Sequence, residues 1–136
     1  MEDRHLFKAK SEINKYFKNK SSWFTGYLIS QYLLLQDDDS VDDAINIIPE
    51  TICQCTGLRD KNNNLIFVND KVLFIDYGRG KEYIGTIEIK KSGLFVIAIR
   101  ENGNFYSYPL LQIVETSSVR IEVIGNIFDE EEETAV

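Results

Sequence analysis

Polar and apolar residues alternate along much of this chain with a period of two, which is typical of β-strands that bury one face. Residues 83–89 and 119–125 show this alternation, and residues 94–99 are apolar on both faces, as in a strand inside a barrel or sandwich. The pattern therefore predicts short strands in the C-terminal half, at residues 72–76, 83–89, 94–100, 104–108 and 119–125.

The N-terminal half also favours strands. One segment follows helical spacing instead, because Ile13, Tyr16 and Phe17 share one face of a short helix if Ser11 caps it. We therefore expect at most one short helix in the protein. The remaining pattern predicts strands near residues 5–10, 23–35, 44–48 and 51–55.

Turn-forming residues separate the predicted strands. Asn102-Gly103 is a strong hairpin signal because both residues accept a positive φ, and Gly78-Arg79-Gly80 and Ser92-Gly93 mark two further connections. Short strands with such closely spaced turns favour a small barrel of SH3-like type. The predicted fold class is all-β: an N-terminal β unit at residues 1–58, packed on an SH3-like β-barrel at 59–128, with an acidic tail at 129–136.

Charge is distributed unevenly along the chain. The net charge of −7 over 136 residues argues against a general duplex-DNA-binding protein, since phosphate affinity depends on excess positive charge. Residues 21–55 hold six acids and no base, and residues 101–136 hold eight acids and one base. Residues 1–20 and 56–100 are each net +3. The barrel-like middle of the chain can therefore still present a local basic surface.

Cations and aromatic residues are interleaved in this middle segment. A small barrel with such residues on one face suits single-stranded nucleic acid, whose bases stack on aromatic rings while cations follow the phosphates. The same residues can also contact a protein partner. The candidate face consists of Lys71, Tyr77, Arg79, Lys81, Tyr83, Lys90 and Lys91.

Side chains suited to metal binding or catalysis are sparse. His5 is the sole histidine, and Cys53 and Cys55 project from the same face of a predicted strand. We expect two reduced, packed thiols, with a redox or metal role as the alternative. We therefore expect no catalytic residue, no metal and no cofactor, and an enzyme is the third of three functional hypotheses.

The two acidic clusters, residues 37–43 and 129–133, are interpreted as a solvated loop and a solubilising tail, with calcium binding as the alternative for the first. The chain opens without a basic-then-apolar segment, and its longest apolar stretch, residues 27–35, is too short to cross a membrane. We expect a cytoplasmic protein with no membrane contact. The aromatic residues of the N-terminal half are interpreted as its core, with a ligand platform as the alternative; they are Trp23, Phe24, Tyr27 and Tyr32.

Several short blocks of sequence occur in a distinctive order. Pro49-Glu50-Thr51 is followed by the stretch Cys55–Asn62 and then by Ile66–Val72, while Trp23–Leu28 precedes them and Val123–Phe128 closes the series. With Phe7–Lys10 at the start, these blocks resemble the YopX family of phage and prophage proteins over residues 7–128. The resemblance implies a two-part, largely β protein encoded by temperate phages, and it implies no particular reaction.

The block residues themselves fit turn architecture. Asp60 can accept backbone N–H groups while Gly57 supplies an unusual φ, and Asp70 can close a second turn in the same way. Asn63 and Asn69 stand where the family usually has Gly, and Asn tolerates left-handed backbone. A general acid–base pair is the alternative for the two carboxylates. The block residues interpreted as structural are Trp23, Gly26, Pro49, Thr56, Gly57, Asp60, Asp70, Gly125 and Asn126, with a bulge expected at Gly125-Asn126.

The sequence therefore favours a non-enzymatic binding or assembly module of a phage or prophage, acting on an unidentified phage or host protein. A homo-oligomer is one form of this hypothesis, since a small open barrel leaves edge strands to be paired. Binding of single-stranded nucleic acid through the local basic face is the alternative.

Overall fold

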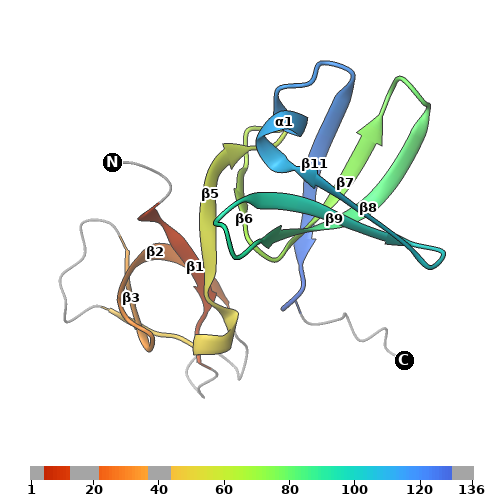
Figure 1. Cartoon of the computed structure of the whole chain (residues 1–136). Coiled ribbons are helices and arrows are strands. Elements are labelled where there is room, and N and C mark those ends of the chain that lie inside the picture. Colours follow the sequence, from red (N-terminus) through yellow and green to blue (C-terminus); the bar gives the residue numbers. More distant parts are fainter. Residues whose placement is uncertain (1–4, 13–21, 37–43, 130–136) are drawn as a thin grey trace, which may run out of the picture. The chain divides into compact units, whose positions relative to one another are not determined.

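The computed structural model describes residues 5–12, 22–36 and 44–129, and the chain divides into two compact units, residues 1–57 and 58–136 (Figure 1). Almost all of the regular structure is antiparallel β-sheet, which confirms the predicted all-β fold class. The helix predicted after Ser11, the acidic cluster at residues 37–43 and the acidic run at 130–133 lie outside the described residues.

The first unit is a small sheet in which neighbouring strands follow the order β4-β3-β2-β1-β5. Ala9, Leu34 and Ile47 are fully buried at its core, and Phe24 and Leu28 are among the apolar residues that pack against them. The strands are β1 (Phe7–Lys10), β2 (Trp23–Ser30), β3 (Leu33–Leu35), β4 (Ile45–Asn46) and β5 (Cys53–Arg59), with the 3₁₀ turn η4 (Pro49–Thr51) before β5.

The prediction of one strand over residues 23–35 is wrong, because the chain turns at Gln31 and Tyr32. The Ser30 hydroxyl accepts the Tyr32 N–H at 3.1 Å, and a serine that bonds its own backbone in this way favours a turn. The strands on either side form a hairpin in which Leu28 lies opposite Leu34. A Cβ on Gly26 would collide with the Leu35 carbonyl group, so the hairpin requires glycine there.

The strand predicted at residues 51–55 begins later than expected. Pro49 starts the 3₁₀ turn η4, in which Thr51 is buried, and β5 then runs from Cys53 to Arg59. Cys53 and Cys55 are buried on one face of β5, which confirms that they are packed there; their reduced state stays a prediction. Within the described residues, no three His, Cys, Asp or Glu side chains come close enough together to hold a metal ion.

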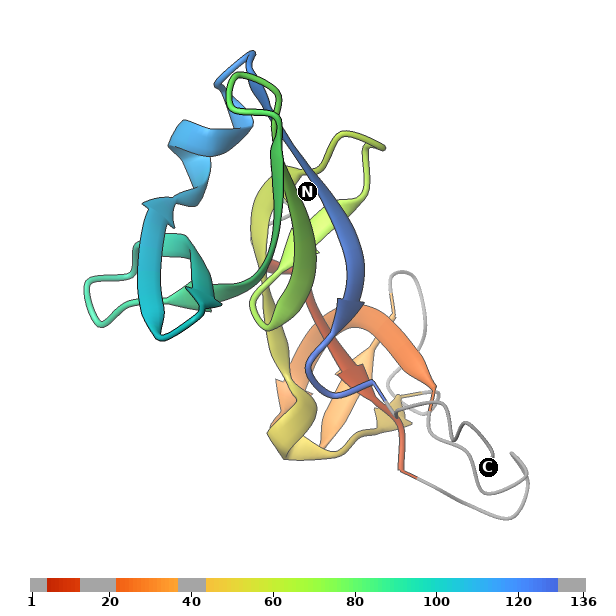
Figure 2. The ribbon, with the colours of Figure 1, turned by 90° about the vertical axis from the view of Figure 1, so that its right-hand side faces the viewer.

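The second unit contains a five-stranded antiparallel sheet with the order β10-β9-β8-β7-β11. Figure 2 shows β11, in blue, beside β7, in green, although the two strands are far apart in the sequence. Each strand agrees with its prediction to within two residues at either end. The strands are β7 (Asp70–Asp76), β8 (Lys81–Ile89), β9 (Phe95–Glu101), β10 (Asn104–Pro109) and β11 (Val119–Asn126). The sequence did not predict the short strand β6 (Leu65–Phe67), which neighbours β5.

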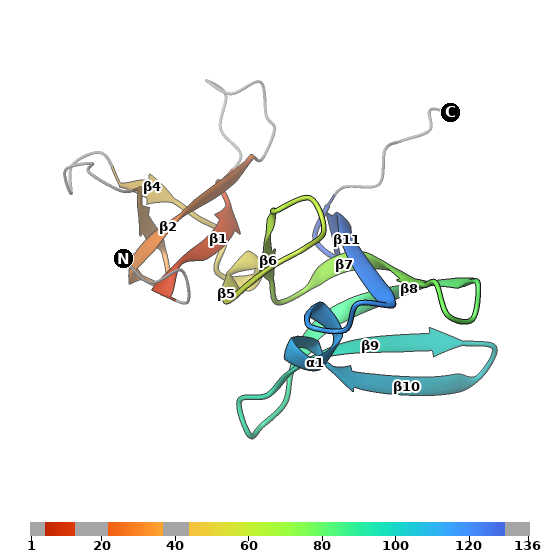
Figure 3. The ribbon, with the colours of Figure 1, turned by 90° about the horizontal axis from the view of Figure 1, so that it is seen from above.

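The sheet does not close into a barrel, and the SH3-like type stays a prediction. Strands β10 and β11 stand at the two ends of the strand order, and Figure 3 shows β10 at the margin of the sheet beyond β9. The sheet is nevertheless strongly curled, since the rings of Phe74 on β7 and Tyr108 on β10 stack with centroids 5.7 Å apart. Three strand spacings in a flat sheet would separate these strands by about 14 Å.

The turns adopt the backbone that the sequence predicts. Asn102 and Gly103 have φ values of 48° and 82°, as a two-residue hairpin turn between β9 and β10 requires. Asn63 and Asn69 also have positive φ, as expected of a residue type that tolerates left-handed backbone. The register of β11 against β7 shifts between Val123 and Gly125, at the predicted bulge.

A short helix, α1 (Leu110–Val114), follows Pro109 and packs Leu110 and Ile113 into the core of the second unit. The sequence pattern did not predict it, because five residues are too few to establish a helical period. No helix in the described parts of the chain combines the length and apolar character needed to cross a membrane.

Candidate functional site

The candidate basic face does not assemble at one place on the second unit. Arg79 and Lys81 lie at the turn that joins β7 to β8, whereas Lys90 and Lys91 follow the far end of β8. The nine-residue step from Lys81 to Lys90 corresponds to about 30 Å of extended strand. Lys71 is exposed on β7 and pairs in register with Thr86, nearer the end occupied by Lys90.

Two members of the face are engaged by their neighbours. The Arg79 guanidinium lies 3.8 Å from the Asp76 carboxylate, which also accepts the Arg79 backbone N–H at 3.1 Å. Tyr83 is half-buried and lies edge-on to Phe74, with ring centroids 6.0 Å apart. Tyr77 is 61% exposed in the turn. The arrangement therefore offers no single row of cations and stacking rings for a nucleic-acid strand.

A different cluster forms a recess in the same unit. Phe74, Tyr83 and Tyr108 line it with three aromatic rings, and its volume is about 250 Å³. The Phe74 and Tyr108 rings stack at an interplanar angle of 28°, while the Tyr83 ring stands at 68° to that of Phe74. We call this recess the aromatic cleft. Its remaining lining residues are Asp76, Arg79, Gln112, Ile113, Thr116 and Val119.

The aromatic cleft is built by the curl of the sheet and by the segment around α1. Phe74 on β7 lies directly opposite Tyr83 on β8, so both rings are on the inner face of the hairpin. Tyr108, near the end of β10, reaches them across the curled sheet. Helix α1 then places Gln112 beside the rings. Sequence reasoning identified Arg79 and Tyr83 but missed the others, whose segments carry no shared motif.

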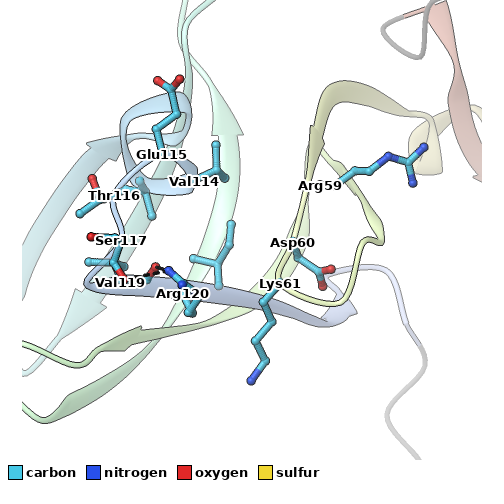
Figure 4. Close-up of a pocket in the computed structure, with 11 residues that line it drawn as sticks. Arg59, Asp60, Lys61, Val114, Glu115, Thr116, Ser117, Val119 and Arg120 are labelled. Atoms are coloured by element: carbon cyan, nitrogen blue, oxygen red, sulfur yellow. Dashed lines mark hydrogen bonds between the residues drawn. The ribbon is translucent and has the colours of Figure 1, made fainter.

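A larger hollow of about 330 Å³ lies on the second unit between the segment after α1 and the turn at Asp60 (Figure 4). Its lining includes three cations, yet their charged groups are engaged elsewhere. The Arg120 guanidinium donates to the Ser117 and Val119 carbonyls at 2.9 Å, and that of Arg59 points away from α1 and donates to the Asn63 carbonyl. Lys61 extends out of the hollow, and its Nζ lies 3.9 Å from Glu122. This hollow therefore does not converge on an anion.

Asp60 performs the turn function that its sequence context predicts. Its carboxylate accepts the N–H groups of Asn62 and Asn64 at 2.9 and 2.8 Å. It also accepts the Val123 N–H, on the outer edge of β11, at 2.8 Å. Gly57 has φ of 81°, the predicted left-handed value. One buried carboxylate thus closes a turn and binds a distant strand.

Asp70 and Asn126 form a second buried pair. The Asp70 carboxylate accepts the Phe67 N–H at 2.8 Å and the Asn126 side-chain amide at 2.9 Å. Asn126 in turn accepts the Phe128 N–H through its Oδ1 atom. Since the carboxylates of Asp60 and Asp70 both accept hydrogen bonds within turns, their geometry fits a structural role better than a role as a general acid–base pair.

The aromatic residues of the first unit divide between core and surface. Tyr32 is 56% exposed, so its prediction as a core residue is wrong. Trp23 is half-buried, and its ring is covered by two ammonium groups of β1, with Lys8 at 4.9 Å and Lys10 at 5.8 Å. Thr56, from the same set of motif residues, is buried on β5.

On the second unit, Arg100 is another cation with engaged neighbours. Its guanidinium donates to the Glu88 carboxylate at 2.9 Å and lies 4.9 Å from the centre of the Phe105 ring. The hydrogen bond with Glu88 and the charge of that carboxylate raise the pKa of Arg100 above its usual value. Arg100 therefore stays charged at all physiological pH values.

The sequence was compared with protein families, curated proteins and solved structures. No curated protein and no solved structure matches it significantly. The family described as YopX protein matches residues 6–133, which is nearly the whole length. That span includes both units and every motif residue discussed above. The chain therefore belongs to the YopX family.

Proposed function

We propose that this protein is a non-enzymatic protein-binding module whose aromatic cleft takes up an extended, proline-containing segment of a partner. The observation that carries the proposal is the convergence of Phe74, Tyr83 and Tyr108 on one recess of about 250 Å³. The phage setting expected from the sequence belongs to the same proposal, with a phage or host protein as the partner.

The chemistry of the cleft fits such a segment. Polyproline II helices dock into aromatic-lined grooves because they are already extended and lose little conformational entropy on binding. Proline rings can pack against the exposed parts of the half-buried Tyr83 and Tyr108 rings, while Phe74, only 4% exposed, forms the floor of the recess. Gln112 and Arg79, both exposed at the cleft, can donate hydrogen bonds to peptide carbonyl groups. This recess therefore combines an apolar floor with a few polar groups that orient the ligand.

The alternative, binding of single-stranded nucleic acid, has less support. The candidate cations are divided between the two ends of β8, and Arg79 is paired with Asp76. The Tyr83 ring is half-buried and packs edge-on against Phe74, so its face is not open for stacking in a row of successive bases. A non-enzymatic role is supported by Asp60 and Asp70, whose carboxylates are used in turns.

A panel of labelled peptides tests the proposal by fluorescence anisotropy. The panel contains proline-rich, apolar proline-free, acidic and basic peptides, with an oligothymidylate as the nucleic-acid arm. We expect the proline-rich group to bind, and Tyr108→Ala to weaken that binding at least tenfold because one wall of the cleft is lost.

Tyr77→Ala is the matched control, since Tyr77 is exposed outside the cleft and its removal should leave peptide affinity unchanged. Circular dichroism verifies that both variants fold. Binding of oligothymidylate that weakens with salt, together with no binding of any peptide group, would overturn the proposal in favour of the alternative.

A further inference from the structure

The two edge strands of the five-stranded sheet differ in the hydrogen bonds that their outer backbone groups make. The outer edge of β11 is already bonded, because the Val123 N–H donates to Asp60 and the Ile121 carbonyl accepts the Lys61 N–H at 3.0 Å. The other edge is β10. In the described parts of the chain, no backbone group outside the β9–β10 hairpin bonds to Asn104–Tyr108, while Pro109 also caps α1.

The register of the hairpin shows which groups of β10 point outward. Because a two-residue turn is flanked by a hydrogen-bonded pair, Asn104 bonds to Glu101, and Tyr106 and Tyr108 are bonded to β9 in the same way. The N–H and C=O groups of Phe105 and Ser107 therefore point away from β9. Pro109 occupies the next outward position, where its missing N–H costs no bond to the sheet.

Strand β10 also lacks the usual protection of an edge. Natural edge strands carry charges, bulges or central prolines that prevent pairing with another chain. The strand from Asn104 to Pro109 contains no charged residue, its register against β9 is regular, and its proline stands at the very end. Phe105 and Tyr106 are 56% and 42% exposed.

We infer that β10 pairs with β10 of a second copy of this chain, in an antiparallel register whose two-fold axis passes through Tyr106. In this register Phe105 lies opposite Ser107 of the second copy, and the two residues exchange both backbone hydrogen bonds. The symmetry repeats this pair on the other side of the axis. The two Tyr106 residues then face each other in a non-hydrogen-bonded pair, the closer of the two antiparallel pair types.

A second copy fits this edge because the edge is complementary to itself. Its outward-pointing groups are arranged symmetrically about Tyr106, as a two-fold contact requires. Each chain carries a net charge of −7, yet β10 is uncharged, so no like charges on the strands oppose each other. One short strand buries little surface, so the dimer should form in a concentration-dependent manner. This inference does not depend on the peptide site.

Cysteine crosslinking tests the register directly. Facing residues of a non-hydrogen-bonded pair have Cβ atoms about 5 Å apart, within reach of a disulfide. We expect Tyr106→Cys to give a disulfide-linked dimer on a non-reducing gel under mild oxidation, whereas Tyr77→Cys stays monomeric. The native Cys53 and Cys55 are buried and do not interfere. Phe105→Cys alone should not crosslink, but it should when mixed with Ser107→Cys. Equal crosslinking of Tyr106→Cys and Tyr77→Cys would overturn the inference.

Light scattering on the full chain provides an independent measurement. The wild type should approach dimer mass as its concentration rises. Ser107→Pro removes an outward N–H without touching the bonds to β9, so it should give a monomer with an unchanged far-ultraviolet spectrum. Ser107→Ala keeps that N–H and should still dimerise. A wild type that stays monomeric, or that uses β10 only to bind an extended peptide, would overturn the inference.

Discussion

A single carboxylate, that of Asp60, replaces a neighbouring strand along part of β11. It accepts three backbone N–H groups, two in its own turn and one from Val123, 63 residues further along the chain. Aspartate suits this position because its short side chain brings two oxygens to adjacent donors without adding conformational freedom. The turn and the strand edge therefore depend on the same side chain.

Removal of this side chain should be costly. We expect Asp60→Ala to lower the free energy of unfolding by about 3 kcal/mol, because it leaves buried N–H groups without an acceptor. Asp60→Asn keeps one oxygen and should cost about half as much. Urea unfolding followed by circular dichroism measures both. Glu115→Ala, at an exposed residue, is the control. Equal stability of Asp60→Ala and Glu115→Ala would contradict this account.

The sequence predicted the roles of single residues correctly where the backbone conformation restricts the residue type. Gly57, Asn63 and Asn69 were assigned to left-handed positions because few other residues tolerate them, and their φ values confirm this. Aromatic side chains were harder to place. Trp23 and Tyr32 have similar apolar surfaces, yet cations of β1 cover Trp23 and Tyr32 lies exposed in a turn. Those neighbours depend on strand pairing, which the pattern does not specify.

At the scale of elements, the strands of the second unit could be predicted because polar and apolar residues alternate along them with a period of two. The shortest elements of the second unit, β6 and α1, contain three and five residues and were missed because they complete too few periods. The β8–β9 pairing also depends on close approach. A Cβ on Gly85 would lie 2.8 Å from a methyl carbon of Ile97 and 3.1 Å from the Ala98 carbonyl oxygen.

We therefore expect Gly85→Ala to lower the free energy of unfolding by about 1–3 kcal/mol through overpacking. Gly78→Ala is the matched control, since Gly78 has no positive φ and its nearest neighbour would be the Asp76 side chain at 3.4 Å. Chemical denaturation of the two variants measures the difference. A loss for Gly78→Ala as large as that for Gly85→Ala would show that packing at β9 is not the cause.

At the scale of the whole molecule, each unit has its own apolar core. Ala9, Leu34 and Ile47 form the first, whereas the second is built from residues of β6 to β11. The sequence indicated two β parts, but it could not predict the aromatic cleft. Phe74, Tyr108 and Gln112 come from separate segments that meet only because the sheet curls. The sequence pattern also assigned to one basic face cations that lie at opposite ends of β8.

Separate cores imply separate responses to mutation. Leu34→Ala should lower the stability of the first unit by about 3 kcal/mol, because it creates a cavity at a fully buried site. The amide chemical shifts of Phe74, Tyr83 and Tyr108 should remain unchanged in nuclear magnetic resonance spectra. Ile97→Ala, in the second core, is the comparison that should move them. Shifts at the cleft residues in Leu34→Ala would show that the cores are coupled.

The bonds that Asp60 and Lys61 make to β11 also limit how far an assembly can grow. A sheet that can be extended at both edges adds copies without end, and such open-ended growth produces fibres. With β11 bonded at Ile121 and Val123, the pairing that we infer through β10 would use the other edge of the five-stranded sheet, so this sheet would not extend beyond two copies. The loop at Asp60 thus blocks extension of the five-stranded sheet at its β11 edge.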